Sequence, residues 1–498
     1  MKFEYNEFKV IENELNKEEL RFSESIMSLA NEYMGMRGNF EEKYSGDSLQ
    51  GTYIGGVWFP DKTKVGWWKI GYPEYFGKMI NSPNFIGIGV SIDGLELDLN
   101  VEDLVSYRRE LDMEKGLLKR SFEIKRSGKT FQIDVERFVS IDTKEICGIK
   151  YSVKAINSEA LVEFTPYLDA DVENEDSNYE DKFWQVLDRG AKENTGYLVS
   201  KTIENNFGVE RFAICNYMVS SLYSDQGQDG KFEAIVSNDS VLTRSGLKIG
   251  PGQSVSLEKI IATTTTRDHK EEDLAHTAGD LARVAAESGY EKLFERHAIK
   301  WRQRWDIADV VIKNNPKLQQ GIRYNIFQLF STYYGDDLRL NIGPKGFTGE
   351  KYGGATYWDT EAYIIPMYLS TAPQEVTRNL LLYRFNQLKE AYHNANMQGL
   401  KGALYPMVTF NGIECHNEWE ITFEEIHRNG SIAYAIYNYA NYTGDYDYIV
   451  EYGIDVLVGI SRFWADSVHY SQRNKKYMIH GVTGPNEYEN NVNNNLYT

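Results

Sequence analysis

The sequence predicts an α+β chain of more than one domain, β-rich in its first half and helical in its second. Up to about residue 265, short segments alternate apolar and polar residues and end in turns, as strands do. From about residue 268 the apolar residues recur every three or four positions, which is the period of an α-helix. At 498 residues the chain is also too long for one ordinary domain.

A hairpin centred on Asp93-Gly94 is the clearest strand signal. Apolar residues alternate over 86–92 and return over 95–99 on the other side of this turn. The alternation recurs over 131–135, after Ser127-Gly128, and again over 161–164 and 254–264. Many short strands of this kind predict a large β-sandwich, which we place at residues 1–267.

Helical periods fill the rest of the chain. Two charged segments with Ala and Leu, 271–285 and 290–305, predict a helical linker over 268–315. Beyond Pro316, a third predicted domain over 316–498 has a shorter helix after Asp359 and apolar stripes over 322–333, 373–392, 432–440 and 449–464. Two long connections, about 336–358 and 397–425, separate these helices. Because long ordered loops in compact domains are usually functional, we expect the site there.

Bulk composition narrows the class of protein. A hydrophobic fraction of 42% argues against a disordered chain, and a formal net charge of -19 argues against binding nucleic acid. The three cysteines, Cys147, Cys215 and Cys415, are far apart and form no CxxC, which suits a reducing compartment. The polar start and the lack of a long apolar run predict a cytoplasmic protein that does not enter a membrane. Phosphate-cradling, dinucleotide-binding and GxSxG motifs are missing from the sequence.

Trp358 and Asp359 end the first long connection, in the run 357–361, YWDTE. An indole ring can stack on the apolar face of a sugar, and a carboxylate can accept hydrogen bonds from two neighbouring hydroxyls. The alternative is structural, with Asp359 and Thr360 capping the following helix and Trp358 in the core.

The second connection contains a dense polar cluster: His416, Asn417, Glu418 and Trp419. Imidazole, amide, carboxylate and indole groups together suit the recognition of sugar hydroxyls. A metal site is one alternative, although the spacing is not HExxH and no further ligand pair is evident. A solvated acidic rim is the other.

Glu487 is the candidate proton donor, in the run 484–488, GPNEY. A turn of this composition can hold a carboxyl beside an aromatic ring and neutral amides. Such surroundings raise the pKa of a carboxyl enough to keep it protonated near neutral pH, as a general acid requires. A solvated Glu in an Asn-rich surface loop is the alternative.

Together these segments resemble glycoside hydrolase family 65, most closely its maltose-acting phosphorylases, over the whole chain. Residues 31–40, NEYMGMRGNF, are similar to the family's N-terminal signature. The run 357–361 is similar to its sugar-binding motif and the run 484–488 to its acid motif. Several separated motifs in the right order are far more specific than any one of them.

The resemblance implies an N-terminal super-sandwich, a helical linker and the first part of an (α/α)6 barrel. It assigns the general acid to Glu487, the sugar-binding pair to Trp358 and Asp359, and the acceptor loop to 416–424. The family's phosphate-binding Lys-Gln pair and small C-terminal β domain would lie beyond Thr498, so we expect a truncated form of a longer enzyme. A homodimer without a cofactor is also implied.

The implied reaction is the inverting phosphorolysis of maltose to β-D-glucose 1-phosphate and D-glucose. Glu487 would protonate the glycosidic oxygen while phosphate attacks the opposite face of C1, so that no second carboxylate is needed as a base. Three alternatives remain: another glucobiose such as trehalose as the substrate, hydrolysis within the same family, or a non-catalytic carbohydrate-binding protein.

Overall fold

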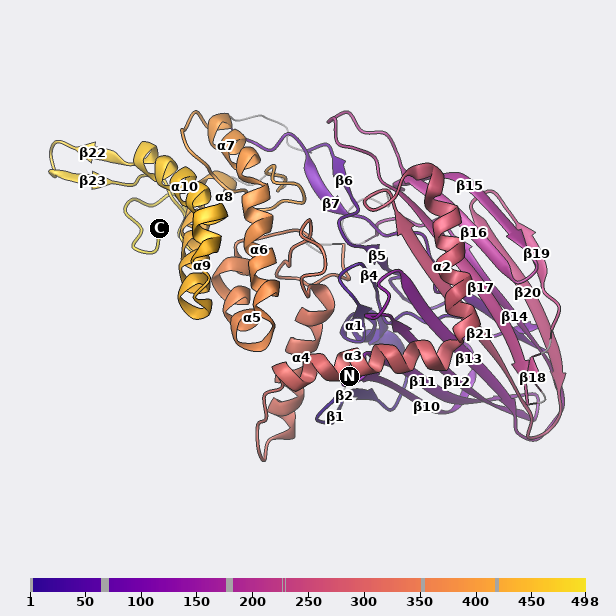
Figure 1. Ribbon diagram of the computed structural model, residues 1–498. Helices are drawn as coiled ribbons and strands as arrows, with labels where there is room; N and C mark the ends of the chain where they lie inside the picture. The colour runs from indigo at the N-terminus through magenta and orange to yellow at the C-terminus, as the bar shows by residue number, and fades with distance from the viewer. Residues whose placement is uncertain are drawn as a thin grey trace.

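A computed structural model describes residues 3–63, 71–175, 182–225, 227–228, 230–350, 354–416 and 421–498. Figure 1 shows most of the strands gathered at one end of the molecule and most of the helices at the other. The chain is thus a multidomain α+β protein with a β-rich N-terminal part, as predicted. Residues 274–308, within the predicted linker of 268–315, form two helices between the last strand of the β-rich part and the helical part (Figure 1).

An 11-stranded antiparallel sheet forms the larger layer of the β-rich part. Its order is β1-β2-β10-β11-β12-β13-β21-β17-β16-β15, with β18 paired to β17. The strands are β1 (Glu4–Tyr5), β2 (Lys9–Glu12), β10 (Asp103–Asp112), β11 (Leu117–Arg126), β12 (Lys129–Val139), β13 (Ile146–Ala155), β15 (Trp184–Lys192), β16 (Thr195–Thr202), β17 (Ala213–Ser224), β18 (Gly227–Gln228) and β21 (Ser254–Thr265).

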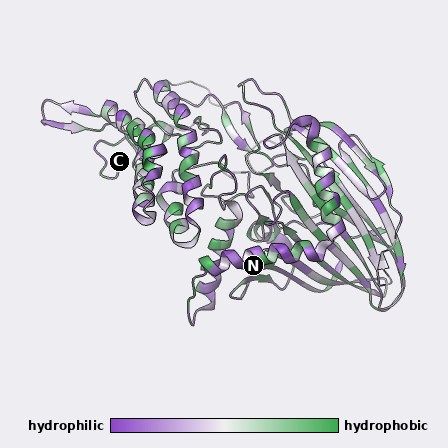
Figure 2. Cartoon of the chain, in the orientation of Figure 1, coloured by the Kyte–Doolittle hydropathy of each residue, from purple (hydrophilic) through white to green (hydrophobic). Residues whose placement is uncertain are grey.

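A five-stranded sheet packs against it as the second layer. Its order is β19 (Glu233–Val236), β20 (Ser240–Ile249), β14 (Ala160–Asp169), β8 (Ile88–Ile92) and β9 (Leu95–Glu96). Alternate residues of β14 are buried, and the ring of Phe164 meets Tyr151 of the large sheet with 5.9 Å between ring centroids. Figure 2 shows the strands banded with hydrophobic and hydrophilic residues, the pattern expected when one face of each sheet is buried.

The predicted hairpin at Asp93-Gly94 is present, but its second strand is shorter than the sequence indicates. Strand β9 contains only Leu95 and Glu96. Leu95 is 59% exposed, whereas Leu97 and Leu99 are buried beyond the end of the strand. Alternation therefore located the turn correctly and overestimated the length of the pairing.

Small elements line the junction between the two parts of the molecule (Figure 1). They are η1 (Lys17–Glu19), α1 (Leu20–Ile26), a sheet of β3 (Leu29–Ala30), β4 (Met34–Met36) and β5 (Thr52–Ile54), and the pair β6 (Trp58–Asp61) and β7 (Phe76–Met79). The carboxylate of Glu32 accepts hydrogen bonds from the backbone N–H groups of Tyr334, Asp336 and Asp337, at 2.7, 3.2 and 2.9 Å. Glu32 is 2% exposed, so this contact joins the β-rich part to the helical part inside the protein.

Buried ion pairs anchor the segment after this junction to the large sheet. Arg120 and Arg137 lie 2.7 and 2.5 Å from the carboxylate of Glu41, and all three side chains are at most 4% exposed. Since charges at this depth are tolerated only when paired, these contacts fix the position of residues 37–42.

Two helices follow the last strand, where the sequence predicts a linker. After η2 (Glu271–Asp273) come α2 (Leu274–Ser288) and α3 (Tyr290–Ala308). Leu274, Ala278 and Ala282 are buried at intervals of four residues, and α2 packs against β17 and β21 with this face. Gly289, with φ of +79°, separates the two helices.

The helical part contains α4 (Pro316–Thr332), η3 (Thr360–Ile364), α5 (Ile365–Thr371), α6 (Gln374–Asn386), α7 (Leu388–Met397), α8 (Ile421–Glu424), α9 (His427–Thr443), η4 (Ile449–Gly453) and α10 (Ile454–Ser467). A hairpin of β22 (His469–Ser471) and β23 (Lys476–Met478) extends from α10 (Figure 1). The single helix predicted over 373–392 is in fact two, interrupted at Gln387. The apolar residues keep helical spacing on both sides of Gln387. Periodicity alone therefore does not reveal the interruption. Within the described residues, no helix is long and apolar enough to cross a membrane.

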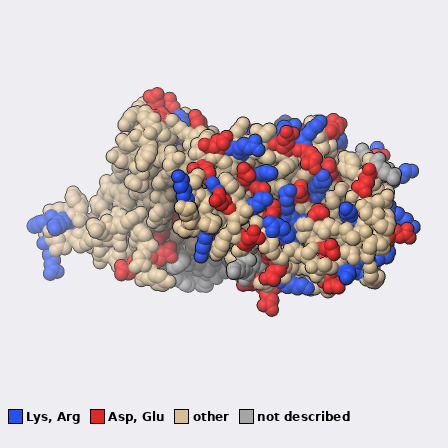
Figure 3. Space-filling view, turned by 90° about the horizontal axis from the view of Figure 1, so that it is seen from below, with Lys and Arg blue, Asp and Glu red and all other residues tan. Residues whose placement is uncertain are grey.

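Charge is distributed unevenly over the surface. In Figure 3, Lys and Arg side chains alternate with Asp and Glu over the β-rich part, while much of the helical part is uncharged. Several aromatic residues of α9 are exposed, among them Tyr434 (54%) and Tyr437 (65%). The face in view therefore shows mixed charge, without a continuous basic area.

Candidate active site

The two long connections meet next to Trp358 and Asp359. Thr356 and Thr409 form an isolated antiparallel bridge, with N···O distances of 2.9 and 3.2 Å, that ties the first connection to the second. Two residues after Asp359, the carboxylate of Glu361 accepts hydrogen bonds from Arg384 at 2.6 and 3.0 Å. Both side chains are at most 2% exposed. The YWDTE run is therefore anchored on both sides of Trp358-Asp359.

Asp359 lies at the start of η3, but its side chain makes no capping hydrogen bond there among the described residues. Burial raises the pKa of the Asp359 carboxyl, and Lys345 opposes this shift. Asp359 and Lys345 line one cavity of about 470 Å³ between α4 and the 343–348 segment. The capping alternative thus loses its main support, and a carboxylate next to a sugar-sized cavity remains.

Trp358 belongs to an aromatic cluster. Its ring meets His427 edge to face, with 4.6 Å between centroids and an interplanar angle of 88°. Tyr363 lies at 5.4 Å and Tyr497 at 6.3 Å. Trp358 is half-buried, so part of the indole stays accessible.

Residues 424–427 connect this cluster to the segment that carries Glu487. The Glu424 carboxylate accepts hydrogen bonds from Thr483 Oγ1 at 2.7 Å and from the backbone N–H of Asn491 at 3.0 Å. Nδ1 of His427 lies 3.3 Å from the carbonyl oxygen of Thr483. The 483–491 loop is thereby held at both ends, where a bridge between Val482 and Val492 also closes it.

Glu487 projects from the middle of the 483–491 loop and is exposed. The adjoining Tyr488 is 99% exposed, so its ring does not shield the Glu487 carboxyl. Burial raises the pKa of Glu425 to about 8, and the negative charges of Glu487 and Asp359 add to this shift, whereas Arg428 opposes it. Two carboxyl groups from two other chain segments therefore act electrostatically on Glu425.

The acceptor-loop candidates are only partly described. His416 is 7% exposed, and its backbone N–H donates to the Glu414 carboxylate at 3.2 Å. Asn417, Glu418 and Trp419 lie outside the described residues. Among the residues that the structure does describe, no cluster of three or more His, Cys, Asp or Glu side chains could hold a metal ion.

The sequence prediction did not single out Glu425 and His427, and it included Glu424 only as the last residue of the acceptor loop, 416–424. The sequence shows them as two carboxylates and an imidazole at the start of an amphipathic helix. That pattern alone also fits an ordinary helix N-terminus, where acidic residues are favourable. Only their contacts with the 483–491 loop and with Trp358 distinguish them.

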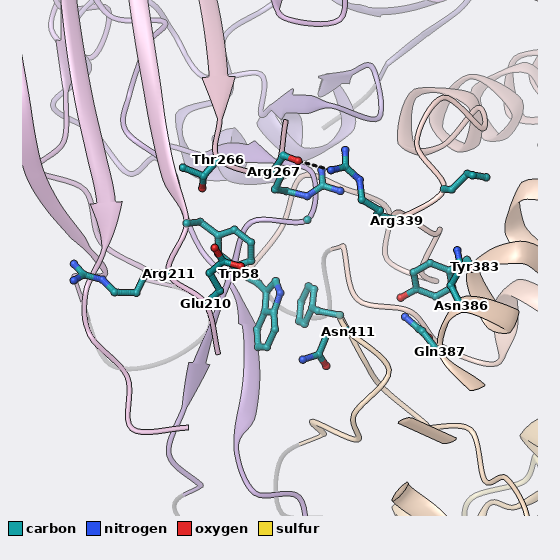
Figure 4. A pocket seen from close by; sticks show the side chains of 14 residues that line it. Trp58, Glu210, Arg211, Thr266, Arg267, Arg339, Tyr383, Asn386, Gln387 and Asn411 are labelled. Carbon is teal, nitrogen blue, oxygen red and sulfur yellow. Dashed lines mark hydrogen bonds between the residues drawn. The ribbon is translucent and has the colours of Figure 1, made fainter. Parts of the chain in front are cut away.

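A second cavity, of about 420 Å³, lies between the β-rich and helical parts (Figure 4). The rings of Trp58 and Phe410 stack on one side, 5.1 Å apart and 8° from parallel. Arg267 and Arg339 also line it, and both pair with Asp337, at 2.9 and 2.7 Å. The charges of these two guanidinium groups are therefore compensated.

Comparisons with known proteins show what the chain is similar to. Residues 10–304 match the profile of the glycosyl hydrolase family 65 N-terminal domain, and residues 323–498 match that of the family's central catalytic domain. The chain is 58% identical over 497 residues to a maltose phosphorylase from Bacillus subtilis, covering 100% of this chain and 64% of the relative. It is 34% identical to an α,α-trehalose phosphorylase from Thermoanaerobacter brockii, covering 96% and 62%.

A solved structure from the human microbiome, provisionally assigned as a kojibiose phosphorylase, superimposes with a TM-score of 0.90 at 28% identity. The match covers 99% of this chain and 63% of that one. The chain thus spans somewhat less than two thirds of the length of these relatives. With one family profile matched over more than half of its residues, the chain belongs to glycosyl hydrolase family 65.

Proposed function

We propose that this chain is part of an enzyme that cleaves maltose with inorganic phosphate to β-D-glucose 1-phosphate and D-glucose. The observation that carries the proposal is the difference in identity between relatives. The chain is 58% identical to a maltose phosphorylase and 34% identical or less to the trehalose, kojibiose and nigerose phosphorylases compared. The grouping of Trp358, Asp359 and Glu487 supports it, because it supplies a stacking ring, a hydroxyl acceptor and a proton donor.

In this proposal Glu487 gives its proton to the glycosidic oxygen as the bond from that oxygen to C1 breaks. A phosphate oxygen forms the new bond to C1 from the opposite face, which inverts the configuration. Phosphate is already a competent nucleophile, so the reaction needs one carboxylic acid and no carboxylate base. Because Glu487 is exposed, the bound disaccharide itself would have to exclude water from the acid.

Asp359 would accept hydrogen bonds from hydroxyls of the glucosyl unit, and the accessible part of Trp358 would stack on its apolar face. His416, Asn417, Glu418 and Trp419 would bind the departing glucose. Phosphate needs cationic and amide donors.

The same proposal includes the domain boundaries, the cellular location and the oligomeric state. The domains are an N-terminal super-sandwich at 1–267, a linker at 268–315 and part of an (α/α)6 barrel at 316–498. The protein is a cytoplasmic homodimer in this proposal. The two packed sheets and the succession of helices after residue 316 support this division.

The direct test incubates the full-length protein with maltose, with and without phosphate, and measures β-glucose 1-phosphate. Product should form only with phosphate, and a panel of glucose disaccharides should show maltose as the best substrate. Release of glucose without phosphate would favour hydrolysis instead, and faster turnover of trehalose would change the substrate. Glu487→Gln should lower kcat by about 10²- to 10⁴-fold, while Glu489→Gln, in the same exposed loop, should leave kcat within about twofold.

A further inference from the structure

Glu425 is a buried carboxyl group without a visible partner. It lies between α8 and α9 and is 1% exposed. Neither carboxylate oxygen has a hydrogen-bond partner among the described residues. Burying a carboxyl group in this way is unfavourable, so its position is unexplained by the packing of the protein alone.

The nearest cation does not account for Glu425. The guanidinium of Arg428 donates to the backbone carbonyl oxygens of Tyr405 and Glu425 and lies 3.8 Å from the carboxylate of Glu414. Its hydrogen bonds are thus directed away from the Glu425 carboxyl, although its charge still lowers the pKa of that group. Burial and the charges of Asp359 and Glu487 outweigh this effect and raise the pKa to about 8, so that Glu425 is mostly neutral at pH 7.

A neutral carboxylic acid differs from a carboxylate in what it can bind. It donates one hydrogen bond and accepts another, which matches the donor and acceptor character of sugar hydroxyls. Phosphate is a poor match, because it needs cationic and amide donors rather than a neutral acid near the Asp359 carboxylate. The segment that carries Glu425 also contacts both halves of the candidate site, through His427 to Trp358 and through Glu424 to the 483–491 loop.

We propose that Glu425 is a further substrate-binding residue, whose carboxyl group hydrogen-bonds a hydroxyl of the glucosyl unit held by Trp358 and Asp359. The assignment rests on the proposed function and adds a residue to it. Glu425 would fix the sugar between Asp359 on one side and the Glu487 acid on the other. It would act on the saccharide and leave the phosphate position unaffected.

The test compares Glu425→Ala and Glu425→Gln in the full-length protein, with Glu489→Gln as the exposed control. Glu425→Ala should lower kcat/KM for maltose about 10- to 100-fold, since a buried partner for a hydroxyl is lost. Glu425→Gln keeps a donor and an acceptor and should lose less than the Ala variant. KM for phosphate should stay within about twofold in both variants, as no phosphate contact is removed.

Two further measurements separate binding from a structural role. Removing an unpaired buried carboxyl should leave the thermal midpoint unchanged or raise it, whereas a structural residue would lower it. Maltose analogues that each lack one hydroxyl of the non-reducing glucose identify the hydroxyl that Glu425 binds. The analogue that lacks this hydroxyl should bind the wild type and Glu425→Ala equally well. Unchanged maltose kinetics in Glu425→Ala, or equal losses for every analogue, would overturn the assignment. If the wild type fails to phosphorolyse maltose, the proposed function fails first.

Discussion

The buried pair of Glu361 and Arg384 allows a quantitative prediction for the motif that carries Trp358 and Asp359. Glu361 is 0% exposed and Arg384 is 2% exposed at the side chain, and two hydrogen bonds of 2.6 and 3.0 Å join them. Glu361→Ala leaves the guanidinium buried, with one long contact of 3.4 Å to the carbonyl oxygen of Tyr357. Removing one partner of such a pair costs about 3–5 kcal/mol of folding free energy.

The assay is urea unfolding at pH 7, followed by tryptophan fluorescence. Glu361→Gln keeps an acceptor and should lose about 1–3 kcal/mol, less than Glu361→Ala. A double variant, Glu361→Leu with Arg384→Met, should recover much of the loss, because both charges are then absent. As an exposed control, Glu96→Ala removes the pair with Lys43, whose side chains are 53% exposed, and should lose less than about 1 kcal/mol. A loss below 1 kcal/mol in Glu361→Ala, or a double variant less stable than it, would refute the reasoning.

Three further predictions concern other parts of the chain. Burial lowers the pKa of His297 to about 3, and both ring nitrogens hydrogen-bond to the backbone. Between about pH 6.5, the ordinary pKa of a histidine, and about pH 3, only the unfolded chain binds a proton at His297. The free energy of unfolding should therefore fall as the pH falls, by about 2 kcal/mol from pH 7 to 5. The change in urea midpoint between pH 7 and pH 5 should be smaller in His297→Gln than in the wild type. Equal changes in the two proteins would contradict this prediction. Glu424→Ala should free the 483–491 loop, and this should lower kcat more than it raises KM. Limited proteolysis should also cut the freed loop faster. Unchanged cleavage would show that Glu424 does not hold this loop in place. Gly402 has φ of +80°, and an added Cβ would lie 2.2 Å from the backbone nitrogen of Phe463. Gly402→Ala should therefore lose more than about 2 kcal/mol in thermal unfolding, and Gly399→Ala, with a similar φ of +73° but open space around it, should lose clearly less.

The architecture followed from the sequence wherever one face of an element is buried along its whole length. Alternating residues over 131–135 gave strand β12, and apolar residues over 432–440 gave helix α9. Local interruptions could not be predicted this way. The interruption at Gln387 leaves the apolar stripe intact, and the short strand β9 ends although Leu97 remains buried.

Prediction of the candidate site selected groups within a distinctive run, such as Trp358 and Asp359, and their roles stay predictions. It did not single out Glu424, Glu425 or His427, because the contacts that bring them to the candidate site join segments about 60 residues apart, such as Glu424 with Thr483. The burial of Glu425 likewise arises from tertiary packing, which neither spacing nor composition encodes.

The contact of Glu32 with the backbone of residues 334–337 has a mechanical consequence. One carboxylate receives three N–H groups across the boundary between the β-rich and helical parts. Hinge bending at this boundary by even about 1 Å would strip hydrogen bonds from a group that water does not reach. The two parts should therefore move together as one stiff body, so under the proposed function substrate entry and product release would rely on loop movements rather than on domain opening and closing.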